Sequence, residues 1–326
     1  MKASKRILVP SALTVVLALA CGGKPGPDRF RVALVTPGPV SDAGWNAAAF
    51  AGLGRIHGEL GADTAHLEAT GPAQFEESFR DFARRGFRLV FGHGFEFQDA
   101  ASTVAAEYPK TAFVVSSGLV TGDNVGSLVF RLEEAAYLAG VMAAGMSRSG
   151  VVGMVGGVEI PPVRLVFDGF RRGFREGRPD GQVKEVFLGS WEDVAGARAA
   201  TLSLLAQGAD LVIHDADAAG LGVFQACRER SVLAFGCNSD QAAVAPDVVV
   251  ASAVMDIPEA MLRVATMVQG GTFRGEVFAF DLASGVVDLK LSPGLRGRVP
   301  EEVLAAVAAA RVRLVRGEVP LEHFGP

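Results

Sequence analysis

Two tryptophans, Trp45 and Trp191, are the side chains of this sequence best suited to hold a flat molecule. Each follows an apolar run and stands at the expected start of a helix, in the stretches VSDAGWN and GSWEDVAGA. A base that stacks on an aromatic ring gains roughly 1–3 kcal/mol. Two rings in matching strand-to-helix positions, far apart in the chain, predict two lobes that each present one flat face to a shared ligand. The alternative is that each tryptophan is half-buried packing.

Polar residues beside Trp45 could contact the edge of such a ligand. Asp42 is placed to cap the N-terminus of the expected helix, a role worth about 1 kcal/mol, and its carboxylate could also accept from a ligand. Asn46 offers both a donor and an acceptor, which suits the edge of a heterocycle. The alternative for Asn46 is a solvated side chain. We expect both residues to contact the ligand.

A second strand-to-helix loop in the first half of the chain is GHGFEFQD, residues 92–99. Its glycines let a ligand approach the backbone closely. Phe95 is the expected aromatic member of the pocket, whereas Phe97 is expected in the core. Asp99 supplies an acceptor for an amino group, or it is simply a carboxylate in the first turn of a helix.

Acidic residues follow two strands in the second half. The run HDAD (214–217) ends one strand, and Asp217 is expected in the polar wall of the pocket. Asp240 comes after the next strand and is the expected polar contact of the second lobe. A histidine beside two aspartates can suggest a metal site. Because no third histidine or cysteine stands at ligand spacing, we predict no metal here.

Other classes of function are disfavoured by composition and motif. The net charge is −5, whereas a nucleic-acid groove needs a basic face. The run GVVGMVGG (150–157) lacks the G-x-G-x-x-G spacing of a dinucleotide site. We see no nucleophile elbow, P-loop or supported Cys–His pair, so the sequence predicts neither catalytic residues nor a cofactor.

Apolar strand patterns alternate with helical patterns along the whole chain after residue 28, and the series restarts near residue 133. Continuous Val/Leu/Phe strands with intervening helices are typical of parallel sheets covered on both faces. We therefore predict an α/β protein with two doubly wound lobes, 29–128 plus 255–283 and 129–254 plus 284–326. Crossings near 128–132, 251–256 and 281–287 would form the hinge. Segments 277–282 and 285–289 are expected to form a strand pair.

The N-terminus has the pattern of a targeting segment. Lys2, Lys5 and Arg6 precede an apolar stretch, 7–20, that is too short for a membrane span. The sequence Ala-Leu-Ala then leads to Cys21 and a Gly/Pro linker that ends at residue 28. This resembles a bacterial lipoprotein signal with Cys21 lipidated, although Ala stands where Leu is usual. Simple secretion and an uncleaved anchor remain as alternatives.

Two further cysteines, Cys227 and Cys237, stand ten residues apart in the sequence. In an oxidising compartment such a pair could form a disulfide. Adjacent helix and strand ends often hold Cα atoms too far apart for bridging, so two buried thiols are the alternative.

Five stretches together resemble the basic membrane protein family of ABC transporter substrate-binding lipoproteins, which includes bacterial purine-nucleoside receptors. They are SDAGWN (41–46), GHGFEFQDAA (92–101), residues 124–157 with EEAAYLAGVMA, GSWEDVAGA (189–197) and FGCNSDQ (235–241). The resemblance covers nearly the whole chain after the signal. It implies a type I periplasmic-binding-protein fold, a ligand held between the lobes, an ABC permease as partner and no catalysis.

The resemblance also implies roles for single residues. Trp45 and Trp191 match the two stacking aromatics of family members that bind nucleosides, and Asn46 matches their asparagine. Asp240 matches the acid that takes sugar hydroxyls. A lysine of the nucleoside binders is absent near Met255, and Gly44 replaces a serine. These differences resemble a subgroup thought to take free nucleobases.

The predicted function is therefore capture of a purine base or nucleoside by a lipid-anchored protein on the periplasmic or extracellular face of the membrane. One alternative is a ligand-sensing subunit of a signalling system. Another is an exported nucleoside hydrolase, in which Asp215, Asp217 and Asp240 would hold Ca²⁺ and a water.

Overall fold

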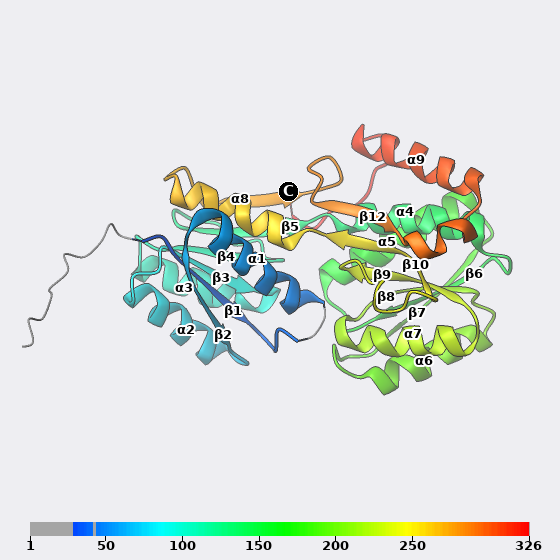
Figure 1. The fold of residues 1–326 in the computed structure, drawn as a ribbon, viewed down its shortest axis with the longest axis horizontal. Helices are drawn as coiled ribbons and strands as arrows, with labels where there is room; N and C mark the ends of the chain where they lie inside the picture. Colours follow the sequence, from blue (N-terminus) through cyan, green and yellow to red (C-terminus); the bar gives the residue numbers. More distant parts are fainter. Residues whose placement is uncertain (1–28, 42–43, 326) are drawn as a thin grey trace, which may run out of the picture.

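The computed structural model describes residues 29–41 and 44–325, which form two α/β lobes side by side (Figure 1). The first, lobe 1, is assembled from the N-terminal part of the chain and one later segment. Its strands are β1 (Arg31–Thr36), β2 (Asp63–Glu68), β3 (Leu89–His93), β4 (Ala112–Ser116), β5 (Val125–Phe130) and β11 (Val277–Phe280). Its helices are α1 (Trp45–Leu60), α2 (Pro72–Arg84), the short 3₁₀ helix η1 (Phe95–Phe97), α3 (Gln98–Glu107) and α8 (Ile257–Gln269).

The second, lobe 2, takes up most of the remaining chain. Its strands are β6 (Val151–Gly156), β7 (Gln182–Phe187), β8 (Leu211–Asp215), β9 (Leu233–Asn238), β10 (Val249–Met255) and β12 (Val287–Leu291). Its helices are α4 (Leu132–Met146), α5 (Pro161–Gly177), α6 (Val194–Ala206), η2 (Asp217–Ala219), α7 (Gly220–Glu229), η3 (Pro293–Arg298) and α9 (Glu301–Val315).

The two sheets share one plan. Their strand orders are β11-β5-β4-β3-β1-β2 and β12-β10-β9-β8-β6-β7, so every strand of lobe 1 has a counterpart in lobe 2. Neighbouring strands are parallel, except that β12 runs antiparallel to β10. The predicted pair of doubly wound lobes is confirmed.

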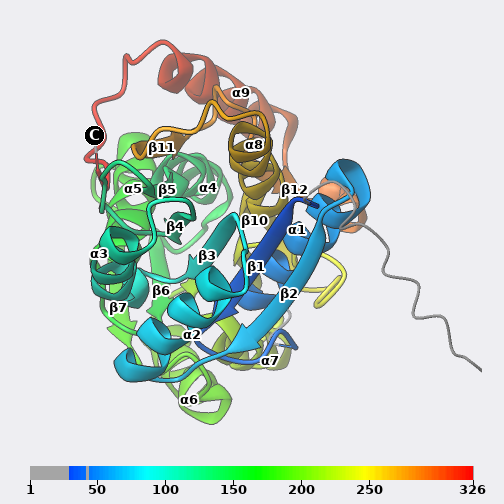
Figure 2. The same ribbon diagram turned by 90° about the vertical axis from the view of Figure 1, so that its left-hand side faces the viewer.

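Helices cover both faces of each sheet, and this is why the inner strands are almost continuously apolar, whereas the edge strands β2 and β7 are mixed. All residues of β3, β4 and β8 are buried. In lobe 1, α2 and α3 pack on one face, and α1 and α8 pack on the other (Figure 2). In lobe 2, α6 and α7 cover one face, and α4 and α5 cover the other.

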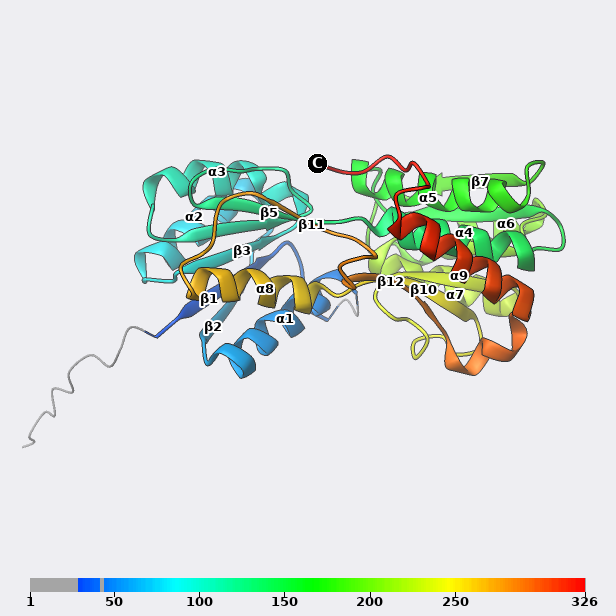
Figure 3. The same ribbon diagram turned by 90° about the horizontal axis from the view of Figure 1, so that it is seen from above.

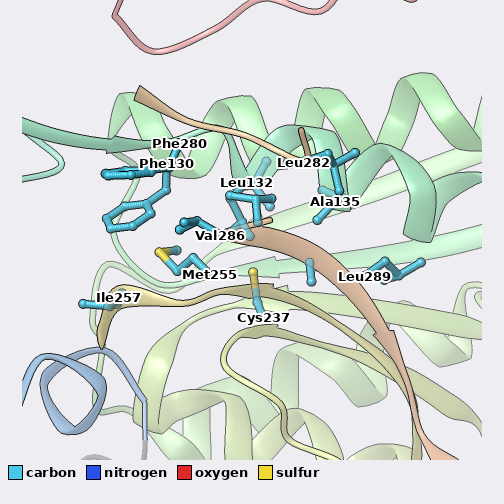
Figure 4. Close-up of a cluster of buried hydrophobic side chains, with 14 of the residues drawn as sticks. Phe130, Leu132, Ala135, Cys237, Met255, Ile257, Phe280, Leu282, Val286 and Leu289 are labelled. Atoms are coloured by element: carbon cyan, nitrogen blue, oxygen red, sulfur yellow. The ribbon is translucent and has the colours of Figure 1, made fainter. Parts of the chain in front are cut away.

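Within residues 44–325, three connections between elements join the lobes: β5 to α4, β10 to α8 and β11 to β12. Their side chains form one apolar cluster (Figure 4). The rings of Phe130 and Phe280 lie 6.0 Å apart, centroid to centroid, and Leu132, Met255 and Ile257 pack in the same cluster. Because it lies where the chain crosses between the lobes, we call it the hinge cluster.

Two local predictions are wrong. The strands β11 and β12 do not pair with each other; β11 pairs with β5 in lobe 1, and β12 pairs with β10 in lobe 2. The connection between β11 and β12 runs from lobe 1 to lobe 2, so the two strands belong to different sheets and do not form a hairpin. The N-cap of α1 is Gly44, without a side-chain cap, and not Asp42. Asp42 lies outside the described residues.

Close contact between α4 and α5 depends on three glycines. A Cβ atom at Gly140 would collide with the backbone of Phe170, and one at Gly173 would collide with the Tyr137 carbonyl. A Cβ at Gly169 would strike the carbonyl of Glu133. Without side chains at these positions the two helix backbones come together, and Glu133 is held at the N-terminal end of α4.

The chain after α9, residues 316–325, is here called the C-terminal tail. It runs from lobe 2 back toward the middle of the molecule (Figure 3). His323 contacts the buried carboxylate of Glu133, with 2.7 Å between Nδ1 and Oε1. Gly325 lies against lobe 1, close to Leu119 and Val129. The tail therefore bridges the two lobes.

The two cysteines of lobe 2 are free thiols in the structure. Cys227 on α7 and Cys237 on β9 are both buried. Cys21, the predicted lipidation site, lies outside the described residues. None of the helices within 29–41 and 44–325 combines the length and apolar character needed to cross a lipid bilayer.

Candidate functional site

A cavity of about 630 Å³ lies between the lobes. Residues after β1, β3 and β4 line it from lobe 1, and residues after β7, β8 and β9 line it from lobe 2. The carboxyl ends of parallel strands are the usual place for ligands in open α/β sheets. The volume is in the range of small-molecule sites. We call this cavity the cleft.

Trp45 lines the cleft as the first residue of α1. Its indole ring stacks on the imidazole of His93, with centroids 4.1 Å apart and planes 21° apart. The Nε2–H of His93 donates to the Trp45 carbonyl at 3.0 Å, because that carbonyl can only accept. The Ser116 hydroxyl then donates to Nδ1 at 2.9 Å. Burial lowers the pKa of His93 to about 3, so a neutral ring backs the tryptophan.

Trp191 lines the opposite side of the cleft, from the loop between β7 and α6. Its ring packs so closely on Gly157 that a Cβ atom there would collide with it. The Trp191 carbonyl accepts from the Ala219 N–H at 2.9 Å. Contrary to the expectation from the sequence, the two tryptophans do not occupy equivalent positions in the lobes. Trp45 follows β1, whose counterpart is β6, whereas Trp191 follows β7, the counterpart of β2.

Asn46 and Phe95 also line the cleft. Asn46 is buried on the first turn of α1, beside the loop glycine Gly38. Phe95 begins η1 and is exposed toward the cavity, with its ring 6.2 Å from that of Phe324 in the C-terminal tail. Of the ligand contacts predicted in lobe 1, and within the described part of the chain, Trp45, Asn46 and Phe95 therefore reach the cleft.

A linked pair of carboxylates forms the polar part of lobe 2. The Asn238 side-chain amide donates to Asp215 Oδ1 and to Asp217 Oδ1, both at 3.1 Å. Asp215 is buried, and burial raises its pKa to about 6. All three residues line the cleft. They present acceptor oxygens to any ligand bound there.

Backbone strain gathers at the same place. The described non-glycine residues with positive φ are Ser117 (55°), Asp217 (44°), Ser231 (55°) and Asn238 (69°). Three of them, Ser117, Asp217 and Asn238, line the cleft. Left-handed conformations of such residues cost free energy and cluster at functional sites. Ser117 and Asn238 also occupy equivalent places in the two lobes. Ser117 directly follows β4, Asn238 ends β9, and β4 and β9 are counterparts.

Two predicted contacts do not reach the cleft. Asp99 is exposed in the first turn of α3 and is not part of the lining. Asp240 is exposed in the loop after β9, where its carboxylate accepts from the Ala242 N–H at 3.1 Å. The strand β9 runs to Asn238, so the residue at its cleft end is Asn238 and not Asp240. Asp42 lies outside the described residues.

Sequence reasoning missed several cleft residues, among them Glu133, Ser117, Asn238 and Phe324. Asn238 stands in the stretch FGCNSDQ, and a strand predicted to run as far as Asn238 would have placed it at the cleft. Phe324 could not have been found, since nothing in residues 316–325 indicates that this tail returns to the cleft. Within 29–41 and 44–325, no group of three or more His, Cys, Asp or Glu side chains is placed to hold a metal ion.

Comparisons with known proteins agree with this arrangement. A family model described as "ABC transporter substrate-binding protein PnrA-like" matches residues 30–312. A purine-binding protein of Brucella abortus (strain 2308) is 28% identical over 309 residues, 94% of this chain and 87% of that protein. The transcriptional activator protein med of Bacillus subtilis (strain 168) is 27% identical over 277 residues, 84% and 86% of the two chains.

A solved structure gives the same fold. The chain is similar to an ABC transporter solute-binding protein from Aeropyrum pernix K1, with a TM-score of 0.82 and 21% sequence identity. The match covers 90% of this chain and 93% of that one. At this identity the likeness concerns the fold alone. It extends over both lobes and so includes the cleft between them.

Proposed function

The chain belongs to the PnrA-like family of ABC transporter substrate-binding proteins, and from that premise we propose that it captures a purine base or nucleoside in the cleft. The two lobes have the type I periplasmic-binding-protein fold. The ligand would be held by stacking and by polar contacts along its edge, and released unchanged to a permease.

The observation that carries this proposal is the pair of tryptophans in one cavity. Trp45 comes from lobe 1 and Trp191 from lobe 2, and each ring is backed by its own lobe, through His93 or Gly157. Such backing fixes the orientation of both rings before a ligand arrives. At roughly 1–3 kcal/mol per stacked ring, the two rings supply a large share of the about 8 kcal/mol that micromolar affinity needs.

The relatives support a purine. The Brucella abortus relative that aligns over 94% of this chain is named a purine-binding protein. Asn46 offers a donor and an acceptor for the edge of a base, and Asp217 offers acceptors for its N–H groups.

We propose a free base more than a riboside. Met255, the last residue of β10, lines the cleft near the place where the family resemblance implies a lysine in nucleoside binders. Without that cation, and with Asp240 outside the lining, two of the groups implied for the ribose are missing from the cleft.

Isothermal titration calorimetry of the purified protein tests the proposal. The panel is adenine, hypoxanthine, guanine, their ribosides and an unrelated sugar. We expect micromolar or tighter binding of at least one free base, and weaker binding of its riboside. Tighter binding of the riboside would overturn the free-base choice. Heat signals from the sugar alone, or from no purine, would overturn the purine assignment.

Ligand capture is proposed to close the two lobes about the hinge cluster of Figure 4. Closed and open forms of such proteins interconvert by hinge motion. Small-angle X-ray scattering with and without the bound purine measures this closure. We expect a smaller radius of gyration with ligand, and an unchanged radius would contradict the hinge.

We propose export and lipid attachment at Cys21, followed by docking on an ABC permease at the outer face of the cytoplasmic membrane. Labelling of cells with a radioactive fatty acid should mark the wild-type protein and leave Cys21→Ala unlabelled. Equal labelling of both would overturn the lipid site.

A sensor role is the rival reading, since one relative is named a transcriptional activator. Deletion of the permease distinguishes the two. Loss of purine uptake in both the permease deletion and the deletion of this protein supports transport. Uptake that persists without this protein, together with altered transcription, supports sensing.

A further inference from the structure

The charged side chains of the cleft are all of one sign. Among the described residues that line it, Glu96, Glu133, Glu192, Asp215 and Asp217 carry carboxyl groups, and none is a lysine or an arginine. The two buried imidazoles nearby, His93 and His214, are held neutral, because burial lowers their pKa values to about 3 and about 4. No lysine or arginine of the described lining therefore offsets the carboxylates; outside the lining, the His323 imidazole contacts Glu133.

We infer that the cleft selects, by charge, a flat ligand that carries hydrogen-bond donors and no negative charge, and that its donors face Asp215 and Asp217. This inference takes its location from the proposed function and narrows the ligand class. Amino-substituted and protonated rings fit it. Ligands with a phosphate or an ionised ring oxygen do not.

The contacts of the acid pair carry the inference. The side-chain amide of Asn238 donates to one oxygen of Asp215 and to one oxygen of Asp217, and the Cys237 thiol also donates to Asp215. Each carboxylate has a second oxygen, and a carboxylate can accept several hydrogen bonds. The raised pKa of Asp215 follows from burial without a cationic partner. A donor or a positive charge on the ligand would add to these contacts with the acid pair.

The walls of the cleft suit the same ligand. Trp45, Phe95, Trp191 and Phe324 place aromatic rings around the cavity, on both sides and from the tail. Aromatic faces attract cations as well as flat neutral rings. An anion would meet the negative faces of these rings and the carboxylates together, and both contacts are repulsive.

The test compares ligands that differ in charge. Adenosine is paired with adenosine monophosphate, and the planar cation 1-methylnicotinamide is paired with the planar anion nicotinate. We expect calorimetry on the wild-type protein to give at least hundredfold weaker binding of the anionic member of each pair. Binding of an anionic member within threefold of its partner would overturn the inference.

Size must be separated from charge. Asp217→Asn and Asp215→Asn remove a charge without changing the shape of the side chain. We expect each variant to reduce the ratio of the two affinities within a ligand pair, here called the gap, at least threefold. Asp240→Asn is the matched control, because Asp240 is exposed and outside the lining, and we expect it to leave the gap unchanged. A gap that neither cleft variant narrows would mean that size excludes the anions, which would overturn the inference.

The two proposals fail in different ways. If 1-methylnicotinamide binds and no purine does, the purine assignment is wrong and the charge inference stands. If purines bind and phosphate is tolerated, the purine assignment stands and the charge inference is wrong. If neither purines nor the cation bind, both are wrong.

Discussion

Strands β3 and β8 occupy the same place in their two sheets, and each is followed by a short 3₁₀ helix and then a longer helix, but β3 ends in His93 and β8 ends in Asp215. In lobe 1 the neutral imidazole supports the ring of Trp45 from behind. In lobe 2 the carboxylate stands in the cleft lining itself. The last residue of this strand thus supports a stacking ring in lobe 1 and is itself a hydrogen-bond acceptor in lobe 2.

This difference has opposite consequences for stability as the pH changes. The folded pKa of His93, about 3, lies below its ordinary 6.5, so its contribution is present above pH 6.5 and is lost as the pH falls toward 3. The folded pKa of Asp215, about 6, lies above its ordinary 3.8, so its contribution is present below pH 3.8 and is lost as the pH rises through 6. Each limiting slope is about 1.4 kcal/mol per pH unit.

The largest predicted effect is therefore on this pH dependence. Urea unfolding of wild type, His93→Gln and Asp215→Asn between pH 4 and pH 7.5 measures it. Relative to His93→Gln, the wild type should lose free energy of unfolding as the pH falls. Relative to Asp215→Asn, the wild type should lose free energy of unfolding as the pH rises. Difference curves that slope in the same direction would contradict the comparison.

The second prediction compares two helix pairs, α4 with α5 inside lobe 2 and α1 with α8 inside lobe 1. Gly173→Ala on α5 should lower the free energy of unfolding by about 3 kcal/mol, because its Cβ meets the backbone of α4. Gly52→Ala on α1 should cost less than Gly173→Ala, about 1 kcal/mol, because its Cβ meets the flexible Met261 sulfur and only approaches the Pro258 Cα at 3.1 Å, while helix propensity improves. Urea unfolding of both variants checks this, and equal losses would sink it.

The third prediction concerns the two tryptophans. Trp45→Ala and Trp191→Ala should each weaken purine binding by about 1–3 kcal/mol, roughly five- to more than hundredfold, while Trp→Phe at either site restores much of it. Only Trp45→Ala should also lower the melting temperature appreciably, because it uncovers the buried His93. Calorimetry and thermal unfolding separate the two effects. Unchanged affinity in both alanine variants would remove the stacking role.

The smallest effect is expected at the tail. Phe324→Ala removes one ring from the cleft and its contact with Phe95, and should weaken purine binding by about 1 kcal/mol, roughly fivefold. Leu321→Ala, a tail residue that is absent from the cleft lining, is the control and should leave the affinity unaltered. Equal losses in the two variants would indicate that the tail acts only through folding.

Much of the fold could be predicted from the sequence, because parallel strands buried on both faces leave long apolar runs that helical stretches interrupt. The pairing of β11 and β12 could not, since two short strands close in sequence pair either with each other or across a hinge, and only the tertiary structure decides. The tryptophans were found because their residue type is rare and their loops are at strand ends.

The acids of lobe 2 show where prediction from the sequence stops. Asp240 was predicted because it follows a strand and because the family resemblance implies an acid there. Strand β9 ends at Asn238, so Asn238 and not Asp240 stands at its cleft end. Strand β8 ends at Asp215, within the run HDAD, and the predicted Asp217 lies in the cleft lining two residues later. An aspartate near a strand end is easy to find, but its exact position relative to the cleft depends on one or two residues of strand length.

The position of the tail has a practical consequence for handling this protein. Phe324 lines the cleft and Gly325 rests on lobe 1, so anything fused after the final residue would emerge beside the mouth of the site. A C-terminal polyhistidine tag would bring imidazoles toward a cleft lined by carboxylates and could occupy it. Purification handles and fluorescent reporters belong instead between Cys21 and Arg29, which leaves the proposed signal and lipid site unchanged, because β1 begins at the end of lobe 1 that is remote from the other lobe (Figure 3).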